Sequence, residues 1–405
     1  MQTLRYKGQK QKNQLPFDIN SGNKLALIME KSVKYCIFLS AAEPSADSHC
    51  AGLIKALRNQ TDSIEFVGLG GEKMAEAGCK LIETTVGRAA MIYNAFSKVP
   101  HYYMLLRRVK KYLLKNKPDM VIVCDSPAFN FHVAKAAKRA GIKTLFYVAP
   151  QLWAWASWRI GKLRKYCDKL ACILPFEEDW FRQRSIEAEY VGNPLLDELE
   201  TASAKSYTEF KPATAKIALL PGSRKAEIES LWQPMQQIVV RLKERFTNLE
   251  IITVAVDKKK KTLLESPVLP DFESSYEIGS VVQIASKADF CIVASGSATL
   301  QVAAVGCPMV IMYQSSKLLW HLIGWWLVKT KHLSLVNILA GKELVPEFMP
   351  YFKSTEPITT VIEQMLSDPN KLSQISKDLI KLVEPLKTKK AGNKVAEIVL
   401  RMLDH

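Results

Sequence analysis

Asp125 is well placed in this sequence to act as a catalytic base. It follows directly on the apolar run Met120–Cys124 and begins the segment Asp-Ser-Pro-Ala-Phe-Asn. A short apolar run of this kind is typical of a buried strand, and a carboxylate at the carboxyl end of such a strand can accept a proton from a substrate hydroxyl. Asp also caps turns, so the motif alone favours neither role over the other.

Arg224 lies in a segment suited to binding an anion. Pro221-Gly222 breaks the apolar run 217–220, and we expect Ser223 to open a helix with Glu227 in its first turns. Free backbone N–H groups at the start of a helix attract phosphate, and a guanidinium can bind phosphate in a bidentate manner.

A second turn of small residues follows another apolar run. Ser295, Gly296 and Ser297 come directly after 290–294, and small side chains let backbone N–H groups approach phosphate oxygens closely. Such a turn is ordinary by itself. Together with the segment around Arg224, it predicts a cradle for a nucleotide diphosphate.

The elements that position these residues form two series of short apolar runs alternating with helical patterns. The predicted strands are 35–39, 65–68, 120–124, 144–148, 170–174 and 189–191, and then 217–220, 251–255, 290–293 and 309–312. Apolar strands alternating with helices predict parallel sheets covered on both faces. We therefore expect an α/β protein of two doubly wound domains, divided near 200–215, whose ligands bind at the carboxyl ends of the strands.

The composition narrows the class of partner. The formal net charge of +16 favours a polyanion or an anionic membrane surface. Zinc-finger spacing, RNP-like aromatic motifs and basic-region heptads are absent, which argues against nucleic acid. The eight cysteines include no CxxC pair and the six histidines show no ligand spacing, so we expect reduced thiols, no disulfide framework and no metal site. Residues 1–31 contain no apolar core, so we do not expect a secretory signal peptide there. Because they are polar and lysine-bearing, we expect them to be a disordered leader.

Two segments combine aromatic or apolar residues with cations. Residues 98–117 carry many Lys and Arg and no acid, which indicates a solvated helix face or attraction to an anionic membrane. The segment 149–159 is rich in tryptophan and is followed by further cations. This composition is typical either of the packed start of a helix or of a site that binds an acylated, phosphorylated substrate. The cations at its end and just after it are Arg159, Lys162, Arg164 and Lys165. The apolar stretch 318–328 contains three tryptophans and is too short to span a membrane.

Taken together, these segments resemble the bacterial lipid-A-disaccharide synthase family. The resemblance covers the chain from about residue 33 to near its end. The segments that carry it, in order, are 45–47, 66–68, 117–119, 125–130, 153–155, 174–177, 190–192, 220–224, 294–298 and 335–341.

The resemblance implies a GT-B fold, in which two Rossmann-like domains face each other across a cleft. It implies an acceptor and membrane-side domain at 32–205, a UDP-sugar-binding domain at 206–365, and C-terminal helices at 366–405 that pack on the first domain or on a partner subunit. The implied reaction is metal-independent and inverting. It joins UDP-2,3-diacylglucosamine to 2,3-diacylglucosamine 1-phosphate (lipid X), needs no cofactor, and takes place on the inner face of the bacterial inner membrane; a homodimer is left open.

The resemblance also assigns residues to the site. Asp125 matches the base, and Arg224 matches the arginine on the diphosphate side. Glu347 is expected to be structural. The remaining expected substrate-binding residues are Glu43, Ser45, Asp47, Asn130, Ser223, Ser295, Gly296, Ser297, Gln301 and Asn337.

Several positions depart from the family pattern. Ala42 and Ala46 replace glycines, which predicts strain of about 1 kcal/mol if either backbone needs a positive φ. Ala128 replaces an aspartate, Asn193 a histidine, and Gln301 a glutamate that would accept from ribose hydroxyls. A glutamine accepts without charge assistance, so weaker nucleotide binding is expected. These changes leave two alternatives: a paralogue acting on another nucleotide sugar, and a catalytically weakened membrane-associated binding protein.

Overall fold

The computed structural model describes residues 34–85, 99–154, 156–197, 199, 203–315, 330–387 and 390–404. The leader 1–31, Trp155 and the tryptophan-bearing segment 318–328 lie outside these ranges. Among the described residues, no helix is long and apolar enough to cross a membrane.

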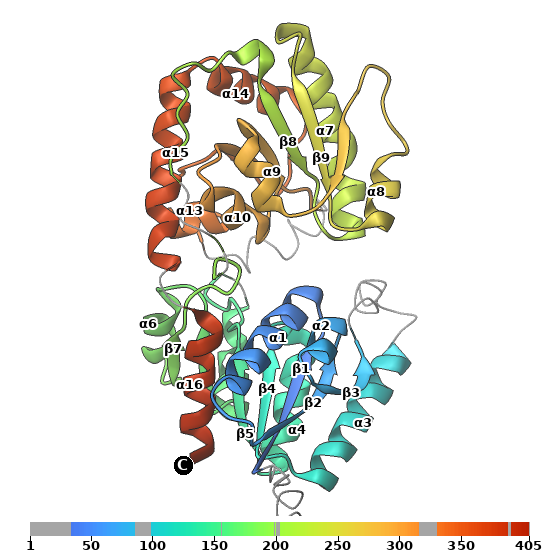
Figure 1. Ribbon diagram of the computed structural model, residues 1–405, viewed down its shortest axis with the longest axis vertical. Helices are drawn as coiled ribbons and strands as arrows, with labels where there is room; N and C mark the ends of the chain where they lie inside the picture. Colours follow the sequence, from blue (N-terminus) through green and yellow to red (C-terminus); the bar gives the residue numbers. More distant parts are fainter. Residues whose placement is uncertain are drawn as a thin grey trace, which may run out of the picture.

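The first domain is built on a seven-stranded parallel sheet with the order β3-β2-β1-β4-β5-β6-β7 (Figure 1). Its strands are β1 (Tyr35–Ala41), β2 (Ile64–Gly70), β3 (Lys80–Thr84), β4 (Met120–Cys124), β5 (Lys143–Tyr147), β6 (Lys169–Cys172) and β7 (Ala188–Tyr190). Its helices are α1 (Pro44–Arg58), α2 (Glu72–Glu76), α3 (Val99–Asn116), α4 (Pro127–Arg139), α5 (Ile160–Tyr166) and α6 (Glu177–Arg182).

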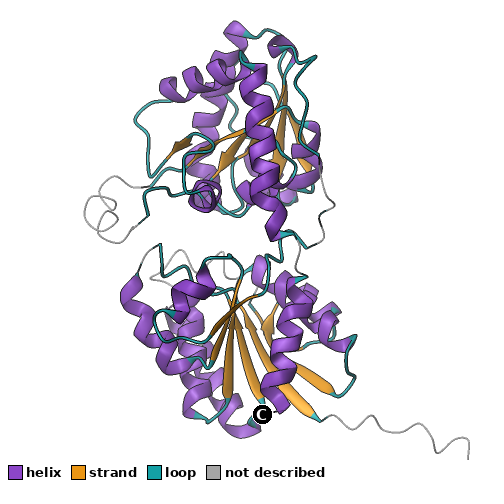
Figure 2. Ribbon diagram, turned by 90° about the vertical axis from the view of Figure 1, so that its left-hand side faces the viewer, coloured by secondary structure: helices purple, strands orange, loops and turns teal. Residues whose placement is uncertain are grey.

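Helices cover both faces of this sheet, which explains why its central strands are apolar throughout (Figure 2). Side chains of successive residues in β4 point to opposite faces. Met120, Ile122 and Cys124 share an apolar cluster with residues of α1, whereas Val121 and Val123 share a second cluster with residues of α3 and α4.

The second domain repeats the plan with a six-stranded parallel sheet of order β10-β9-β8-β11-β12-β13. Its strands are β8 (Lys216–Leu220), β9 (Glu250–Ala255), β10 (Ser275–Ile278), β11 (Phe290–Ala294), β12 (Met309–Met312) and β13 (Glu347–Phe348). Its helices are α7 (Lys225–Arg245), α8 (Lys258–Leu264), α9 (Val281–Lys287), α10 (Ala298–Ala304), α13 (Leu335–Ala340), α14 (Glu356–Leu366) and α15 (Pro369–Val383).

The chain passes from the first domain to the second earlier than the sequence predicted. Val191 belongs to a core cluster of the first domain, and Leu196 already belongs to that of the second. The Nζ of Lys205 donates to the carbonyl oxygens of Ala285 at 3.0 Å and Ser286 at 2.8 Å. The boundary therefore lies between Val191 and Leu196 and not at 205. The sequence did not reveal it, because an irregular segment between domains has no periodic pattern.

The C-terminal helices divide between the two domains, so 366–405 is not the single unit that the resemblance implies. Leu372 and Leu379 of α15 are buried in the core of the second domain. Only α16 (Ala391–Asp404) returns to the first domain, where Val395 and Val399 are buried beside α1 (Figure 1). Both helices are amphipathic, so the sequence pattern could not tell which domain each one covers.

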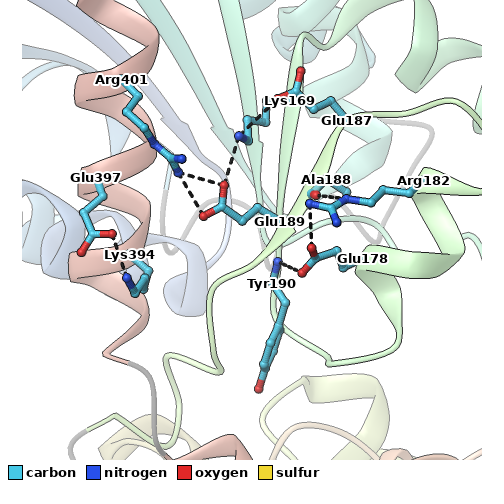
Figure 3. Close-up of polar contacts among 10 residues, drawn as sticks. All are labelled: Lys169, Glu178, Arg182, Glu187, Ala188, Glu189, Tyr190, Lys394, Glu397 and Arg401. Atoms are coloured by element: carbon cyan, nitrogen blue, oxygen red, sulfur yellow. Dashed lines mark hydrogen bonds and ion pairs between the residues drawn. The ribbon is translucent and has the colours of Figure 1, made fainter.

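Polar contacts fix α16 against the edge of the first sheet (Figure 3). The Nη2 of Arg401 donates to both carboxylate oxygens of Glu189 on β7, at 3.0 and 2.9 Å. Lys169 on β6 pairs with the same carboxylate at 3.1 Å. The Nζ of Lys143 donates to the carbonyl oxygen of Met402 at 2.8 Å. The return of the chain is thus held by ion pairs as well as by apolar packing.

Each sheet reverses its strand order at one place, between β1 and β4 in the first and between β8 and β11 in the second. In open parallel sheets, ligands bind outside the carboxyl ends of the strands at such a switch point. The four loops that follow these strands contain Glu43, Asp125, Arg224 and Ser295.

Candidate active site

Asp125 lies in a strained turn at the end of β4. Its φ is +52° and that of Ser126 is +45°, a left-handed conformation that non-glycine residues seldom adopt. Strain of this kind costs of order 1–3 kcal/mol per residue and persists only where the surroundings enforce it. The turn brings the half-buried Asp125 to the switch point and lets Pro127 start α4.

Asn130 is one of the groups that enforce this turn. Its side chain is fully buried, and its Nδ2 donates to the carbonyl oxygens of Cys124 at 2.9 Å and Asp125 at 2.7 Å. Its Oδ1 accepts from the hydroxyl of Ser40 on β1 at 2.7 Å. The structure thus gives Asn130 a positioning role beneath Asp125 in place of the expected contact with substrate.

The surroundings adjust the acidity of Asp125. Burial raises the pKa of its carboxyl to about 6, and the negative charge of Glu43 adds to the increase. The N–H of Ser126 and the guanidinium of Arg224 act in the opposite direction on this pKa. A carboxylate whose pKa lies close to neutrality is suited to general base catalysis.

The loop after β1 places its three predicted residues differently. Glu43 is half-buried at the start of α1, and Ser45 is exposed in the first turn of that helix. Asp47 is buried, and its carboxylate accepts from the backbone N–H groups of Gly71 at 2.7 Å and Met74 at 3.2 Å. Asp47 therefore fixes the start of α2 to α1, and its expected role in substrate binding is not supported by this geometry.

The loop after β8 differs from the sequence expectation in one important respect. The backbone N–H groups of Ser223 and Arg224, which we expected to be free, both donate to Oε2 of Glu227 at 3.1 Å. Helix α7 begins at Lys225, two residues later than expected. Glu227 was the residue whose effect was missed. Its sequence signal is the acidic residue at the third helical position, which reaches back to the N-cap.

Arg224 connects the two domains. Its guanidinium contacts Glu43 of the first domain at 3.3 Å and Glu227 of its own helix at 3.1 Å. The Arg224 side chain is 51% exposed, so each pair contributes about 1 kcal/mol or less. Two carboxylates thus lie where an anionic ligand would bind, and their weak hold allows such a ligand to replace them.

The loop after β11 is open. Gly296 and Ser297 are exposed, Ser295 is half-exposed, and the N–H of Ser295 donates to the carbonyl oxygen of Met312 at 2.9 Å. Gln301 lies half-buried in α10. This turn is therefore exposed at the second switch point, although the N–H of Ser295 is already paired.

The polar atoms of Asn337 are taken up by other protein groups. It is fully buried; its Nδ2 donates to the carbonyl oxygen of Val345 at 2.8 Å and to Glu347 at 2.9 Å, and its Oδ1 accepts from the N–H of Leu344 at 2.8 Å. Glu347 also accepts from the N–H of Leu333 at 2.9 Å. The expectation that Asn337 binds substrate is not supported, because its polar atoms hold the loop between α13 and β13 in place.

The alanines of the first loop are not strained. Ala46 lies inside α1, and neither Ala42 nor Ala46 has a positive φ. The expected penalty of about 1 kcal/mol is therefore absent. Of the predicted site residues, the structure brings Glu43, Asp125 and Arg224 together, with the Ser295–Ser297 turn at the adjacent strand end of the second sheet.

Comparison with known proteins shows the family to which the chain belongs. A family model described as lipid-A-disaccharide synthetase matches residues 37–402. The lipid-A-disaccharide synthase of Syntrophus aciditrophicus (strain SB) is 31% identical over 374 residues, which are 91% of this chain and 97% of that protein.

Solved structures with the same fold include a glycosyltransferase and an epimerase. The calicheamicin glycosyltransferase CalG4 superposes with a TM-score of 0.55 at 14% identity, over 91% of this chain and 98% of that one. The UDP-GlcNAc 2-epimerase of Neisseria meningitidis, bound to UDP-GlcNAc, gives 0.56 at 12% identity, over 91% and 99%. The chain belongs to the lipid-A-disaccharide synthetase family and is a glycosyltransferase of the GT-B fold.

Proposed function

We propose that this chain transfers 2,3-diacylglucosamine from UDP to the 6-hydroxyl of 2,3-diacylglucosamine 1-phosphate, with release of UDP. One observation carries the proposal. The guanidinium of Arg224 lies near enough to Asp125 to act on the pKa of its carboxyl, although the two residues lie at the switch points of different domains. A proton acceptor on one side and a fixed cation on the other are what a direct displacement needs.

In the proposed reaction, Asp125 accepts the proton of the acceptor hydroxyl while the hydroxyl oxygen attacks the anomeric carbon. The bond between that carbon and the diphosphate oxygen breaks, and its electron pair leaves with UDP. One displacement inverts the anomeric configuration. Positive charge for the leaving diphosphate comes from Arg224, so the proposed step uses no metal ion.

Binding of the donor requires an exchange of anions at Arg224. Its present partners Glu43 and Glu227 are carboxylates, and phosphate oxygens can occupy the same positions on the guanidinium. Glu43 is then left near Asp125, where its charge keeps the pKa of that carboxyl high. The exchange therefore leaves the base in an environment that favours proton uptake.

Helix α3 carries the features expected of a membrane-facing surface. Tyr103 is 62% exposed, Met104 52% and Leu114 50%. Tyr103 and Leu114 line a hollow together with the cations Arg107, Lys110, Lys111 and Lys115. Exposed apolar side chains beside cations bind anionic lipid surfaces, so we place the first domain against the inner face of the bacterial inner membrane.

The membrane assignment is tested by cosedimentation with phosphatidylglycerol vesicles. Lys110→Gln combined with Lys111→Gln is expected to weaken binding about 30-fold, since each cation near the surface contributes about 1 kcal/mol. Lys258→Gln with Lys259→Gln, on exposed positions of α8, is the charge-matched control and is expected to bind as wild type does. An equal loss of vesicle binding in both double variants would indicate only a general effect of net charge.

The reaction is tested by UDP release from UDP-2,3-diacylglucosamine, with and without lipid X, and by mass spectrometry of the product. We expect acceptor-dependent release and one tetra-acylated disaccharide 1-phosphate. UDP-GlcNAc and UDP-glucose serve as comparison donors, because Gln301 leaves a paralogue open. Turnover of a comparison donor alone would assign the chain to another nucleotide sugar, and UDP binding without any turnover would favour a binding protein.

A further inference from the structure

A small cavity lies between α4 and α5 of the first domain. Its volume is about 230 Å³. This is below the roughly 300–1,000 Å³ of pockets that enclose whole drug-sized ligands, so it fits a head group better than a complete sugar nucleotide. The side chains that define its chemistry are Phe131, His132, Lys135, Arg159, Lys162 and Tyr166.

The charged groups that line this cavity are all cations. Among the residues that the structure describes, no Asp or Glu lines it, and neither Lys135 nor Lys162 forms an ion pair with another of them. Lys138, one turn along α4, contrasts with them because it pairs with Asp168. Like charges that share a cavity repel one another unless an anion is bound between them.

His132 reports this excess of positive charge. Burial lowers the pKa of its imidazole, and the charges of Lys162 and Lys135 lower it further. A bound anion would offset the repulsion and raise that pKa. The imidazole is therefore a local probe of occupancy.

The cavity is adjacent to the catalytic turn. Pro127 and Ala128, which also line it, are in the first turn of α4, two and three residues after Asp125. An anion in the cavity and a hydroxyl at Asp125 would thus both lie at the start of α4. The proposed acceptor is a single sugar that carries both groups.

We infer that this cavity binds the phosphomonoester of the acceptor sugar and so orients its hydroxyl toward Asp125. The inference rests on the proposed function. It also indicates which cations of the tryptophan-rich region would contact the phosphate. Arg159 and Lys162 line the cavity. Lys165 does not line it, and Arg164 donates instead to the carbonyl oxygen of Arg184 at 2.6 Å.

The kinetic test compares Lys135→Gln and Lys162→Gln with Lys165→Gln, an exposed lysine one turn along α5. We expect each cavity variant to raise KM for lipid X about tenfold, the usual effect of losing a charge-assisted contact to phosphate. The control is expected to stay within twofold of wild type. With 2,3-diacylglucosamine, which lacks the phosphate, all three variants are expected to match wild type. An unchanged KM for lipid X in both cavity variants would overturn the inference.

A binding test separates this inference from the proposed function. Soluble glucosamine 1-phosphate is titrated while the His132 imidazole is followed by NMR. We expect a saturable rise in the pKa of His132 that is lost in Lys162→Gln and kept in Lys165→Gln. If lipid X is turned over but His132 does not respond, the cavity assignment fails and the function stands. If His132 responds but lipid X is not a substrate, the function fails and with it the assignment to this acceptor.

A third measurement distinguishes the acceptor from a phospholipid head group. Lys135→Gln and Lys162→Gln are expected to bind phosphatidylglycerol vesicles as wild type does. A loss of vesicle binding together with an unchanged KM for lipid X would show that the cavity contacts the membrane, which would overturn the inference.

Discussion

The turn after β4 in the first domain and the turn after β8 in the second each lie at the switch point of a sheet built on the same plan, yet they differ in residue type. Asp125 and Ser126 hold φ values of +52° and +45° without glycine. The second domain has Gly222 at a φ of +111°. The first turn therefore holds a charged side chain in place at the expense of strain. In the second turn, glycine adopts the positive φ without strain, and the N–H groups of Ser223 and Arg224 are paired with Glu227.

The two domains also contribute charges of opposite sign to the candidate site. The first domain contributes the carboxylates Glu43 and Asp125, and the second contributes the cation Arg224. In the proposed function, one topology thus serves proton transfer on one side and anion binding on the other. The comparison teaches that the shared fold sets where a residue acts, while the loop sequence sets what it does.

The largest effect is expected from removing the base in the first half. Asp125→Asn keeps the shape of the side chain but cannot accept the proton, so kcat is expected to fall at least 100-fold. UDP affinity, measured by calorimetry, is expected to stay within twofold of wild type. A kcat close to wild type would remove Asp125 from the mechanism and with it the contrast between the halves.

Removing the cation of the second half is expected to act on binding. Arg224→Ala should weaken UDP binding about tenfold or more, because a bidentate, charge-assisted contact is lost. Lys225→Ala, which removes the adjacent exposed cation, is the matched control and is expected to change UDP affinity less than twofold. Equal losses in both variants would show that net charge, and not the Arg224 contact, attracts the nucleotide.

Exchanging the glycine and non-glycine turns tests the difference in strain. A Cβ added to Gly222 would lie 2.6 Å from Oε2 of Glu227, at a φ that alanine avoids. Gly222→Ala is therefore expected to lower the free energy of unfolding by about 1–2 kcal/mol, whereas Ser126→Gly should leave it unchanged or slightly higher. Thermal unfolding measures both. Gly52→Ala, with nothing within 4 Å of the added Cβ, is the control. If Ser126→Gly unfolds at a lower temperature than Gly222→Ala, the proposed difference in strain between the two turns is wrong.

The smallest effect is expected in the pH profile. Because the raised pKa of Asp125 is about 6, its carboxylate is protonated and inactive at lower pH, so kcat/KM should rise between about pH 5 and 7. Glu43→Gln removes a negative charge that raises this pKa, and the acidic limb should therefore move to lower pH. A limb that stays in place or moves upward would show that Glu43 does not act on the base.

Most of the fold could be predicted because buried parallel strands are apolar runs. All ten predicted strands exist, with ends displaced by no more than two residues. The missed strands are β3, β10 and β13. Residues of β3 and β10 are largely exposed at sheet edges, and β13 has two residues, so none of them forms an apolar run.

The site could be predicted only in part. The positions of Asp125 and Arg224 after strand ends could be predicted, because both residues follow apolar runs. Asn130, Asp47 and Asn337 were expected at the substrate but are buried with backbone partners. A polar residue near a strand end can face the ligand or hold the loop. That choice depends on long-range contacts that a local pattern does not contain.

A crystal structure of the UDP complex would test the account most directly. We predict that the diphosphate contacts the guanidinium of Arg224 in place of Glu43 and lies beside the Ser295–Ser297 turn, with its sugar-bearing end toward Asp125. A complex in which UDP is bound elsewhere, while the ion pairs of Arg224 with Glu43 and Glu227 stay intact, would contradict the assignment of the two halves to one active site.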